Sequence, residues 1–497
     1  MSYALMIQGT GSDVGKSLLV AGIARALVNR GLSVAPFKPQ NMSNNAAVTV
    51  EGGEVGRAQA LQARAARVPL SNHMNPILLK PQSDIGAQVV VQGHMVKSAD
   101  AREYQEIKRT LLPHSLDSFN RLKNKYDFVI IEGAGSPAEV NLRKNDIANM
   151  GFAEAADIPV ILAGDIDRGG VIAQIVGTHA LLSASEKKRV QGYIVNKFRG
   201  DLTLFDDGLK ITTAKTGWQS MGVVPFFNAA KKLPPEDAFS IEPSTRALKD
   251  VHNWNSEEKS PTIHIAVPIF SRIANFDDFD PLRSEPGVKL IMVSAGEPIP
   301  GNSDLVILPG SKSTIADMRF LKDQGWDIDI KAHLRRGGKL LGICGGYQML
   351  GKVIRDPDGI EGSTRKIEGL GLLDFETTMS GNKKLLQENG THIPSQCVVN
   401  GYHMHLGECR GEALKHPFLR LQSGPDGCQS ADGSIMGTYL HGLFANDEFR
   451  LSFLNELKPH TRRVRHFETE IENTLDQLSQ HLEKHLDIDR MLEIAQC

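Results

Sequence analysis

The stretch YALMIQGTGSDVGKS, residues 3–17, joins a short apolar run to a glycine-rich loop. The next stretch, LLVAGIARALVNRG at 18–31, places apolar side chains at helical spacing, and Gly31 suits the C-terminal cap of a helix. A loop between a strand and a helix N-terminus favours phosphate, because backbone N–H groups and the helix dipole point at it. We therefore predict a nucleotide-binding loop. Its expected ATP-binding residues are Thr10, Gly11, Gly15, Lys16 and Ser17.

The spacing of the glycines in this loop is unusual. Five residues separate Gly9 from Gly15, one more than in the common phosphate loop. A lysine there can neutralise terminal phosphates and a serine hydroxyl can bind magnesium, although a tight turn with a solvated Lys16 is the alternative. The longer loop resembles that of dethiobiotin synthetase and its relatives, Gly-Thr-x-Thr-x-Val-Gly-Lys-Thr. This resemblance implies a domain that uses ATP to activate a carboxylate.

Length and composition restrict the class of protein. A chain of 497 residues is too long for one hydrophobic core, so two or more domains are expected. Its 41% apolar and 23% charged residues are typical of a globular protein. A net charge of −2 gives no electrostatic support for nucleic-acid binding, and no apolar stretch reaches membrane-spanning length. With no signal-peptide pattern either, we expect a cytoplasmic protein.

The chain contains two series of predicted strands. In the first half, six apolar runs alternate with helical patterns, which is typical of strand–helix–strand units around a parallel sheet. These runs are Tyr3–Gln8, Ser33–Phe37, Asp127–Ile131, Ile158–Ala163, Tyr193–Asn196 and Gly222–Pro225. The second series comprises apolar runs at 262–267, 289–294, 304–310, 339–344 and 435–442. We predict an α/β protein with an N-terminal phosphate-loop ATPase domain and a C-terminal α/β domain.

The predicted domain boundaries follow from changes in composition. Residues 1–230 are expected to form the ATP-binding domain. Residues 231–261 are rich in proline and charge without apolar periodicity, so they are expected to form a linker. Residues 262–497 would form the second domain. Its final part, from about Glu448, is polar with a helical pattern and is expected to cover that same domain.

Three more positions extend the resemblance to the dethiobiotin synthetase superfamily. Lys38 ends the second predicted strand in VAPFKP, where relatives carry a lysine near the phosphates and substrate; a surface lysine is the alternative. Glu132 ends the buried strand of FVIIEGAGSP, at the sheet edge where ligands bind, and relatives use this glutamate to hold magnesium. Asn196 in IVNKF resembles the adenine-recognising segment, with a turn residue as the alternative. The implied magnesium ligands are Ser17 and Glu132.

Other carboxylates in this half leave two questions open. Asp165 and Asp167 follow a strand in ILAGDIDRGG, where they could bind metal-bound water or cap the next helix. Relatives carry a magnesium aspartate near residues 58–62 that this chain lacks, and Glu54 is a candidate substitute. The sequence therefore does not identify a second magnesium carboxylate.

A cysteine on a predicted sharp turn stands out in the second half. LLGICGGYQMLG puts Cys344 at the end of an apolar strand, with a helix beginning at Tyr347. Such a turn exposes the side chain, and a helix N-terminus lowers the pKa of a thiol. An inert buried cysteine is the alternative, but packing alone needs no turn flanked by Gly342, Gly345 and Gly346. We predict that Cys344 is a nucleophile.

Two other strand ends suit the same chemistry. GTYLHGLF ends a strand at His441, a candidate base for the thiol. VILPGSKST supplies a turn at Gly310, which with Gly345 could donate backbone N–H groups to an oxyanion. The cysteine turn, distal histidine and Pro-Gly strand end resemble the class I glutamine amidotransferase domain. The resemblance implies release of ammonia from glutamine through a thioester on Cys344.

The sequence departs from most class I domains after the histidine. Most members follow it with Pro-Glu, whose glutamate completes a triad, whereas Gly442-Leu443 stands here. The branch that amidates cobyrinic and cobyric acids shares this departure. That branch usually carries Gly-Tyr-Glu-Ile-His where this chain reads GYHMH, so His403 replaces a glutamate. What orients His441 is left open, with His403 and His405 as rival bases.

The two halves together imply the conversion of a carboxylate to an amide. FKPQNMSNN, MNPILLKPQSD and GDIDRGGV resemble the cobyric acid synthases of cobalamin biosynthesis, and the resemblance covers nearly the entire chain. It implies ATP, glutamine and a corrinoid, adenosylcobyrinic acid a,c-diamide, as partners, with several side-chain carboxylates amidated in turn. Mg²⁺ would accompany ATP, and no permanently bound cofactor, nucleic acid or membrane is expected.

The sequence also allows two alternative functions. The first is amidation of the a and c carboxylates earlier in the pathway, by a cobyrinic acid a,c-diamide synthase of the same architecture. The second is a nucleotide-switched ATPase that acts as a partner protein without enzymatic chemistry. Cys344 on its turn argues against the second, because a switch does not require a nucleophile.

Overall fold

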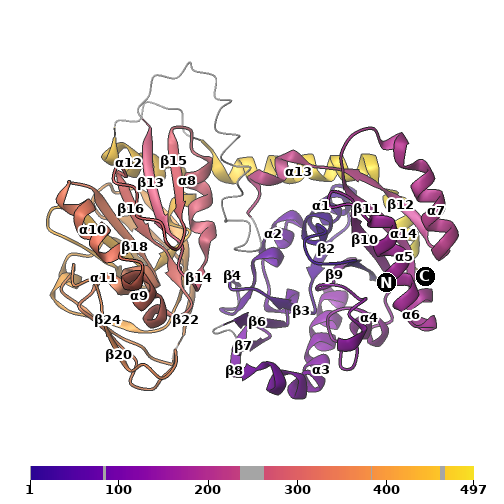
Figure 1. Cartoon of the computed structure of the whole chain (residues 1–497), viewed down its shortest axis with the longest axis horizontal. Helices are drawn as coiled ribbons and strands as arrows, with labels where there is room; N and C mark the ends of the chain where they lie inside the picture. The colour runs from indigo at the N-terminus through magenta and orange to yellow at the C-terminus, as the bar shows by residue number, and fades with distance from the viewer. Residues whose placement is uncertain (1, 82–85, 235–261, 382, 459–464, 497) are drawn as a thin grey trace. The chain divides into compact units, whose positions relative to one another are not determined.

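The computed structural model describes residues 2–81, 86–234, 262–381, 383–458 and 465–496. Internal contacts divide the chain into two compact units, Met1–Pro234 with Glu470–Cys497, and Pro235–Thr469. Each unit has its own parallel sheet, whose strands can be followed in Figure 1. Residues 235–261, most of the predicted linker, lie outside the described residues.

The central sheet of the first unit contains all six predicted strands. They are β1 (Tyr3–Gly9), β2 (Val34–Phe37), β9 (Phe128–Glu132), β10 (Val160–Asp165), β11 (Val190–Phe198) and β12 (Gln219–Pro225). Their order is β12-β11-β10-β1-β9-β2, and every neighbouring pair is parallel. The chain leaves β1 toward β2 on one side and later reaches β10 on the other. The carboxyl end of β1 is therefore the switch point where ligands bind in such sheets.

Helices cover both faces of this sheet. They include α1 (Lys16–Asn29), α2 (Arg57–Ala65), α3 (Ala101–Lys125), α4 (Met150–Ala155), α5 (Val171–Leu181), α6 (Ala184–Arg189) and α7 (Asp206–Thr216). Alternate strand residues such as Met6 and Phe37 form one core with Phe119 of α3 and Phe152 of α4. Their neighbours in the strands point to the opposite face, where α1 packs against β2 and β9. Gly31 follows α1 with φ +92°, as its predicted capping position requires.

A second, smaller sheet follows β2 and was not predicted. Its order is β3-β6-β7-β8. The strands are β3 (Gln40–Met42), β6 (Ile77–Pro81), β7 (Gly86–Val91) and β8 (His94–Asp100), and a hairpin pairs β4 (Ala46–Val48) with β5 (Glu54–Gly56). Polar residues such as Gln40, Asn41, Lys80 and Gln88 interrupt the apolar runs, so these segments lack a clear strand pattern. This insertion begins at the carboxyl edge of the central sheet.

The last residues from Glu470 belong to the first unit, which corrects part of the expectation that the chain from about Glu448 covers the second. Residues 447–457 do lie in the second unit. The helices of this last stretch are α13 (Phe467–His485) and α14 (Ile488–Gln496), and α14 contacts β1. Gly22 of α1 makes room for α13, because a Cβ there would lie 2.4 Å from Leu482 Cδ1. Arg25 of α1, fully buried, pairs with Glu472 at 2.6 Å and Asp476 at 2.9 Å. An amphipathic pattern predicts that a helix is packed, but not which surface it packs against.

The central sheet of the second unit has the order β15-β13-β16-β18-β28-β27. Its strands are β13 (Ile263–Pro268), β15 (Val288–Val293), β16 (Leu305–Leu308), β18 (Lys339–Ile343), β27 (Cys428–Gln429) and β28 (Ile435–Thr438). All pairs are parallel except β27 with β28. The five predicted apolar runs of this half all supply strands of this sheet. Its helices are α8 (Asp280–Ser284), α9 (Thr314–Asp323), α10 (Trp326–Arg335), α11 (Gly345–Leu350) and α12 (Asp447–Leu457).

An antiparallel sheet in the second unit carries the predicted histidine. Its order is β26-β25-β22-β23-β29. The strands are β22 (Lys384–His392), β23 (Val398–His405), β25 (Leu419–Leu421), β26 (Gly424–Asp426) and β29 (Leu440–His441). Shorter strands complete the unit: β14 (Ile273–Ala274), β17 (Gly310–Ser311), β19 (Val353–Arg355), β20 (Lys366–Glu368), β21 (Glu376–Thr378) and β24 (Glu408–Arg410). The chain passes from β28 to β29 within three residues, which brings His441 close to the end of β18.

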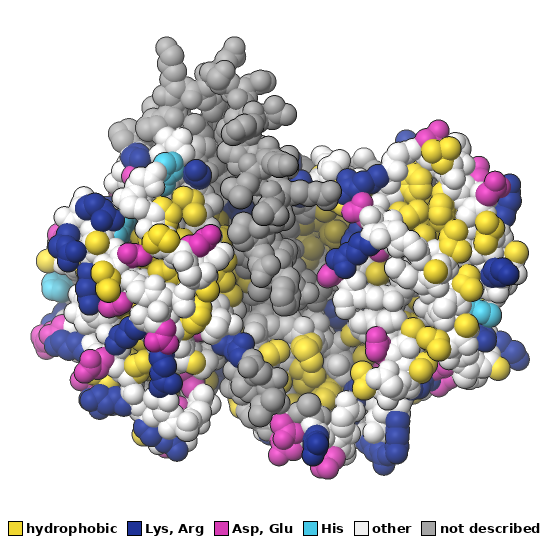
Figure 2. All heavy atoms as spheres, viewed as in Figure 1, with side chains coloured by type: hydrophobic (Ala, Val, Ile, Leu, Met, Phe, Trp, Pro, Cys, Tyr) yellow, Lys and Arg dark blue, Asp and Glu magenta, His cyan; other side chains and the backbone are white. Residues whose placement is uncertain are grey.

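The surface carries a balanced set of charges. The chain has 56 Lys and Arg and 58 Asp and Glu residues, and Figure 2 shows both kinds interspersed on the face it presents. Among the helices that the structure describes, none is both long enough and apolar enough to span a bilayer.

Replacing Arg25 tests the attachment of α13. Its guanidinium also donates to the carbonyl oxygens of Ala65 and Arg64, so Arg25→Ala leaves several buried groups unpaired. We expect a loss of about 2–4 kcal/mol in the free energy of unfolding of the first unit, measured by urea denaturation. Arg30→Ala is the control: Arg30 pairs with Glu483 and Asp489 but is 31% exposed, so it should cost less than about 1 kcal/mol. Equal losses would contradict this account.

Candidate functional site

Close contacts shape the glycine-rich loop after β1. A Cβ at Gly9 would lie 2.6 Å from Val14 Cγ2 and 3.0 Å from Lys16 Nζ. Gly15 precedes α1 with φ +93°, and a Cβ there would lie 2.4 Å from Asn196 Nδ2. Only glycine fits these two positions without displacing its neighbours. The loop is therefore folded tightly around the Lys16 side chain.

Lys16 bridges the ends of two neighbouring strands. Its Nζ donates to Gly11 O at 2.8 Å in the loop after β1 and to Gly135 O at 3.1 Å in the turn after β9. Because α1 begins at Lys16, the N-terminal N–H groups of that helix open onto the same place. Thr10 is directed elsewhere, since its hydroxyl donates to Gln174 Oε1 of α5 at 2.9 Å. The loop can hold phosphate as predicted, with Thr10 at its margin.

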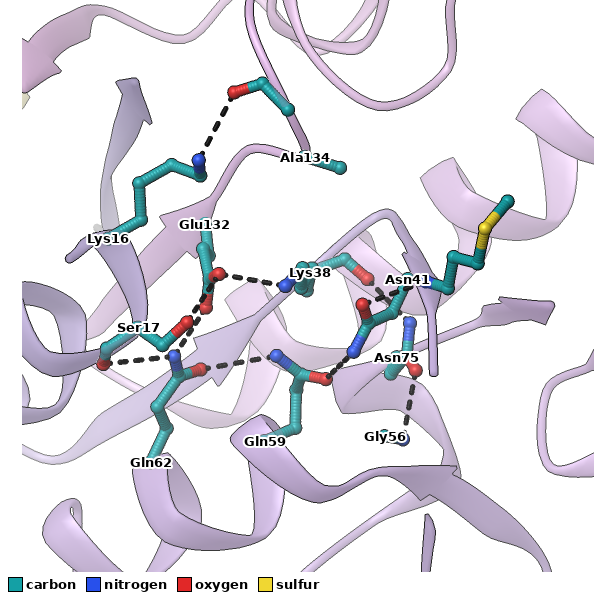
Figure 3. Close-up of polar contacts among 12 residues, drawn as sticks. Lys16, Ser17, Lys38, Asn41, Gly56, Gln59, Gln62, Asn75, Glu132 and Ala134 are labelled. Atoms are coloured by element: carbon teal, nitrogen blue, oxygen red, sulfur yellow. Dashed lines mark hydrogen bonds and ion pairs between the residues drawn. The ribbon is translucent and has the colours of Figure 1, made fainter. Parts of the chain in front are cut away.

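Glu132 lies at the centre of the polar contacts in Figure 3. Its Oε1 accepts from Ser17 Oγ and from Lys38 Nζ, both at 2.8 Å, and its Oε2 accepts from Gln62 Nε2 at 2.6 Å. The Glu132 side chain is 1% exposed and that of Lys38 is 6% exposed. Ser17 and Glu132, the predicted magnesium ligands, are thus adjacent hard oxygen donors. Such a pair fits Mg²⁺ that arrives with nucleotide phosphates.

A chain of carboxamides leads away from Glu132, as Figure 3 shows. Gln59 Nε2 lies 3.5 Å from Gln62 Oε1, Asn41 Nδ2 donates to Gln59 Oε1 at 3.2 Å, and Asn41 Oδ1 accepts from Met42 N at 2.8 Å. Gln59, Gln62 and Asn41 are all buried. The Glu132 carboxylate is therefore connected to β3 through neutral side chains.

The remaining predicted residues of this unit have other partners. Glu54, the candidate second magnesium carboxylate, forms a buried ion pair with Lys80 at 2.7 Å. Asp165 pairs with Lys197 at 2.9 Å and Asp167 pairs with Arg199 at 2.6 Å. Neither aspartate caps α5, whose N-cap is Gly170 with no side-chain cap.

Asn196 is held against the phosphate loop. Its Nδ2 donates to Val14 O at 2.8 Å, beside Gly15, so its amide stabilises the loop's backbone. The next residue, Lys197, has φ +63° within β11, where the pairing with β12 shifts register. Asn196 is therefore a strand residue beside this irregularity rather than a turn residue, and contact with adenine stays a prediction.

Cys344 occupies a strained turn between β18 and α11. Its backbone has φ +53° and ψ −108°, a combination that is costly for a residue with a side chain. A Cβ at Gly342 would lie 2.6 Å from Gly346 O, and a Cβ at Gly346 would lie 2.1 Å from Leu308 O. The sharp turn predicted around Cys344 is confirmed, and its glycines are needed because strand and helix approach so closely.

His441 is held by Asp278, which the sequence analysis did not identify. Its Nδ1 lies 2.7 Å from Asp278 Oδ2, and Asp278 Oδ1 accepts from Gly442 N at 2.7 Å. Burial alone would lower the pKa of His441, but the Asp278 carboxylate and Cys344 raise it, and the net pKa lies well above its usual value. Cys344 also contributes as a hydrogen-bond partner of the imidazole. Cys344, His441 and Asp278 are therefore joined by hydrogen bonds, with the histidine between the thiol and the carboxylate.

The rival base His403 faces away from this set. In the pairing of β23 with β29, Tyr402 lies opposite His441 and His403 lies opposite Leu440. Residues opposite each other share a face of the sheet, so His403 is on the other face from His441. Its Nε2 is 3.2 Å from Asp426 Oδ1. His403 consequently belongs to a separate buried cluster.

The other rival, His405, is also unsuited to act as the base. Its ring stacks on Tyr439 with centroids 3.7 Å apart, and its Nδ1 is 3.3 Å from Gly407 O. Burial lowers the pKa of His405 to about 3. Cys344 Sγ approaches Met404 O at 3.6 Å, so the backbone between the two rivals, rather than either imidazole, adjoins the thiol.

The predicted oxyanion residues Gly310 and Gly345 lie close to each other beside this centre. Gly310 in β17 pairs with Ala274 in β14, and a Cβ at Gly310 would lie 3.1 Å from His441 Cε1. A Cβ at Gly345 would lie 2.9 Å from Ser311 N. Ser311 Oγ donates to the buried Asp317 at 2.5 Å, which fixes the β17 segment. The positions fit an oxyanion role, which stays a prediction.

Two site residues lacked a signal in the sequence. Asp278 lies in NFDDFD, residues 275–280, where three aspartates look alike. Gln62 is one of several polar residues on α2 and has no motif of its own. Only distance in the folded chain distinguishes them, because Asp278 is 163 residues from His441 and Gln62 is 70 residues from Glu132.

Comparison with known proteins identifies both halves of the chain. Residues 5–240 match the model of the CobQ/CobB/MinD/ParA nucleotide binding domain, and residues 264–449 match that of the CobB/CobQ-like glutamine amidotransferase domain. A cobyric acid synthase of Methylorubrum populi is 58% identical over 100% of this chain and 99% of its own length. Cobyric acid synthases of Methylobacterium nodulans and Rhodobacter capsulatus are each 55% identical over 99% of both chains.

Replacing Asp278 tests the cysteine–histidine–aspartate set. If Cys344 and His441 hydrolyse glutamine, Asp278→Asn should lower the rate on the order of 10³-fold, because the histidine loses its orientation and charge partner. The pKa of His441 should also fall, because the negative charge of Asp278 is lost. The imidazolium is then lost at a lower pH. The descending limb of the plot of glutamine hydrolysis rate against pH should therefore shift to lower pH. Asp278→Glu should recover part of the rate. Unchanged rate and profile in Asp278→Asn would exclude Asp278 from this role.

Proposed function

The chain belongs to the cobyric acid synthase family, and on that premise we propose that it amidates several side-chain carboxylates of adenosylcobyrinic acid a,c-diamide to give cobyric acid. ATP would activate each carboxylate as an acyl phosphate, and glutamine would supply the ammonia. Identity of 54–58% to cobyric acid synthases over 99–100% of the chain is the observation that carries this proposal. We propose that the reaction takes place in the cytoplasm, where ATP and glutamine are supplied.

In the second unit, the proposed chemistry begins at the thiol. The Cys344 thiolate attacks the side-chain amide carbon of glutamine, and backbone N–H groups near Gly310 and Gly345 stabilise the oxyanion. His441, held protonated by Asp278, donates a proton to the departing ammonia. Water then hydrolyses the thioester to glutamate and frees the thiol. The close approach of Gly310 to His441 supports this assignment.

In the first unit, the proposed chemistry is phosphoryl transfer. A substrate carboxylate oxygen attacks the γ-phosphorus of ATP, and ADP leaves. Mg²⁺ held with ATP by Ser17 and Glu132 would neutralise charge on the phosphates. Lys16 faces the same region from the loop, where its positive charge can stabilise the transferred phosphoryl group. Ammonia then attacks the acyl carbon, and phosphate leaves the amide product.

The alternative within the same pathway is a cobyrinic acid a,c-diamide synthase. It would use the same residues on the a and c carboxylates of cobyrinic acid, so geometry alone does not separate the two. The family names of the full-length relatives favour cobyric acid synthase.

A product assay tests the proposed function. The protein is incubated with ATP, Mg²⁺, glutamine and adenosylcobyrinic acid a,c-diamide, and the masses of the corrinoid products are measured by mass spectrometry. We expect successive products, each lighter than its precursor acid by the replacement of a hydroxyl with an amino group. Cobyrinic acid is the comparison substrate. Consumption of cobyrinic acid, with the a,c-diamide left unchanged, would overturn the proposal in favour of the diamide synthase.

Replacing Cys344 and Glu132 tests the division of labour. Cys344→Ala should abolish glutamine-dependent amidation and retain amidation with high external ammonia, because the thiol acts only on glutamine. Glu132→Gln should abolish amidation from either nitrogen source and retain glutamine hydrolysis. Loss of the ammonia-dependent reaction in folded Cys344→Ala, or near-normal acyl phosphate formation in Glu132→Gln, would contradict the assignments.

A further inference from the structure

We propose that Lys38 and Mg²⁺ are alternative partners of Glu132, so that the metal that arrives with ATP displaces the Lys38 ammonium from this carboxylate. This inference rests on the proposed function for the use of Mg²⁺ with ATP at this site. It concerns a step that precedes the chemistry. Lys38 Nζ lies 2.8 Å from the same Glu132 oxygen that Ser17 Oγ contacts.

Both oxygens of Glu132 are occupied by protein donors. Oε1 accepts from Lys38 and Ser17, and Oε2 accepts from Gln62 Nε2 at 2.6 Å. The orientation of the Gln62 amide follows from its neighbours, because its nitrogen also lies 3.3 Å from Ser17 O. Two acceptors facing one end of a carboxamide require the NH₂ group at that end. Three of the roughly four lone-pair sites of this carboxylate are thus taken by protein donors, and the Lys38 ammonium at Oε1 competes directly with a metal cation.

The charges around Glu132 disfavour a bare divalent cation. Glu132 is one negative charge, and Lys38 lies against it while Lys16 lies in the adjoining loop. All three side chains are buried, so water screens their interactions weakly. The triphosphate of ATP supplies the missing negative charge and offers the lysines new partners. Metal binding at Glu132 should therefore depend strongly on nucleotide.

Lys38 is built to change partner without moving its backbone. Its backbone N–H donates to Met74 O at 2.8 Å, and its carbonyl accepts from Asn75 Nδ2 at 3.1 Å. Asn75 in turn accepts from Gly56 N at 3.0 Å, as Figure 3 shows. Only the flexible side chain is left to move, and a short rotation carries its ammonium away from Glu132. The Lys38 ammonium then leaves Glu132 only when metal and nucleotide are bound.

Binding of Mn²⁺ without nucleotide tests this exchange. Free Mn²⁺ is measured by electron paramagnetic resonance during titration of the whole protein. Lys38→Met removes the competing cation from Glu132, so we expect its Mn²⁺ affinity to exceed that of the wild type at least about tenfold. Lys16→Met is the matched control, because it removes one buried charge from the same site without touching Glu132. The gain in Mn²⁺ affinity in Lys16→Met should be clearly smaller than that in Lys38→Met.

Three results would overturn the proposal. The first is that the wild type and Lys38→Met bind Mn²⁺ with equal affinity. The second is that Lys16→Met gains as much Mn²⁺ affinity as Lys38→Met, because the effect would then come from overall charge and not from the contact with Glu132. The third is a gain in Lys38→Met that persists when Glu132→Gln is added. Circular dichroism checks folding, and Lys38→Gln replaces Lys38→Met if the latter does not fold. The titration contains no corrinoid, so its outcome is independent of the proposed amidation.

Discussion

The buried carboxylate of Glu132 determines how the first unit's site is built. A charge taken out of water is costly unless opposite charge and hydrogen-bond donors surround it. Here the donors come from three different elements: Ser17 from α1, Lys38 from the end of β2 and Gln62 from α2. Satisfying one carboxylate therefore fixes the relative positions of the phosphate-loop helix, the edge strand and the helix of the insertion.

A second buried carboxylate, that of Asp278, fixes the arrangement of the site in the second unit in the same way. Asp278 satisfies its two oxygens with the His441 imidazole and the Gly442 N–H, both at 2.7 Å. In most class I domains a glutamate two residues after the histidine completes the triad, and that position is Leu443 here. Asp278 reaches the same imidazole from another element, the short helix before α8. The chemistry constrains the contact with histidine, whereas the origin of the carboxylate in the chain is free to vary.

The C-terminal helices make the first unit discontinuous in sequence. Arg25, at the middle of α1, joins the carbonyl end of α2 to Glu472 and Asp476 of α13. Since α2 carries Gln62, the last part of the chain supports the residue that contacts Glu132. The chain therefore enters the first unit twice, once before and once after the glutaminase-like unit.

Local patterns in the sequence determined the six strands of the first sheet, the glycine-rich loop and the strained turn at Cys344, because apolar spacing and glycine placement act over a few residues. The same patterns missed the insertion sheet, whose strands mix polar and apolar residues. Only the tertiary structure decided that Asp278 holds His441 across 163 residues and that Arg25 meets Glu472 across 447. Which of several similar aspartates or helices makes such a contact depends on how the whole sheet packs, and no short stretch of sequence carries that information.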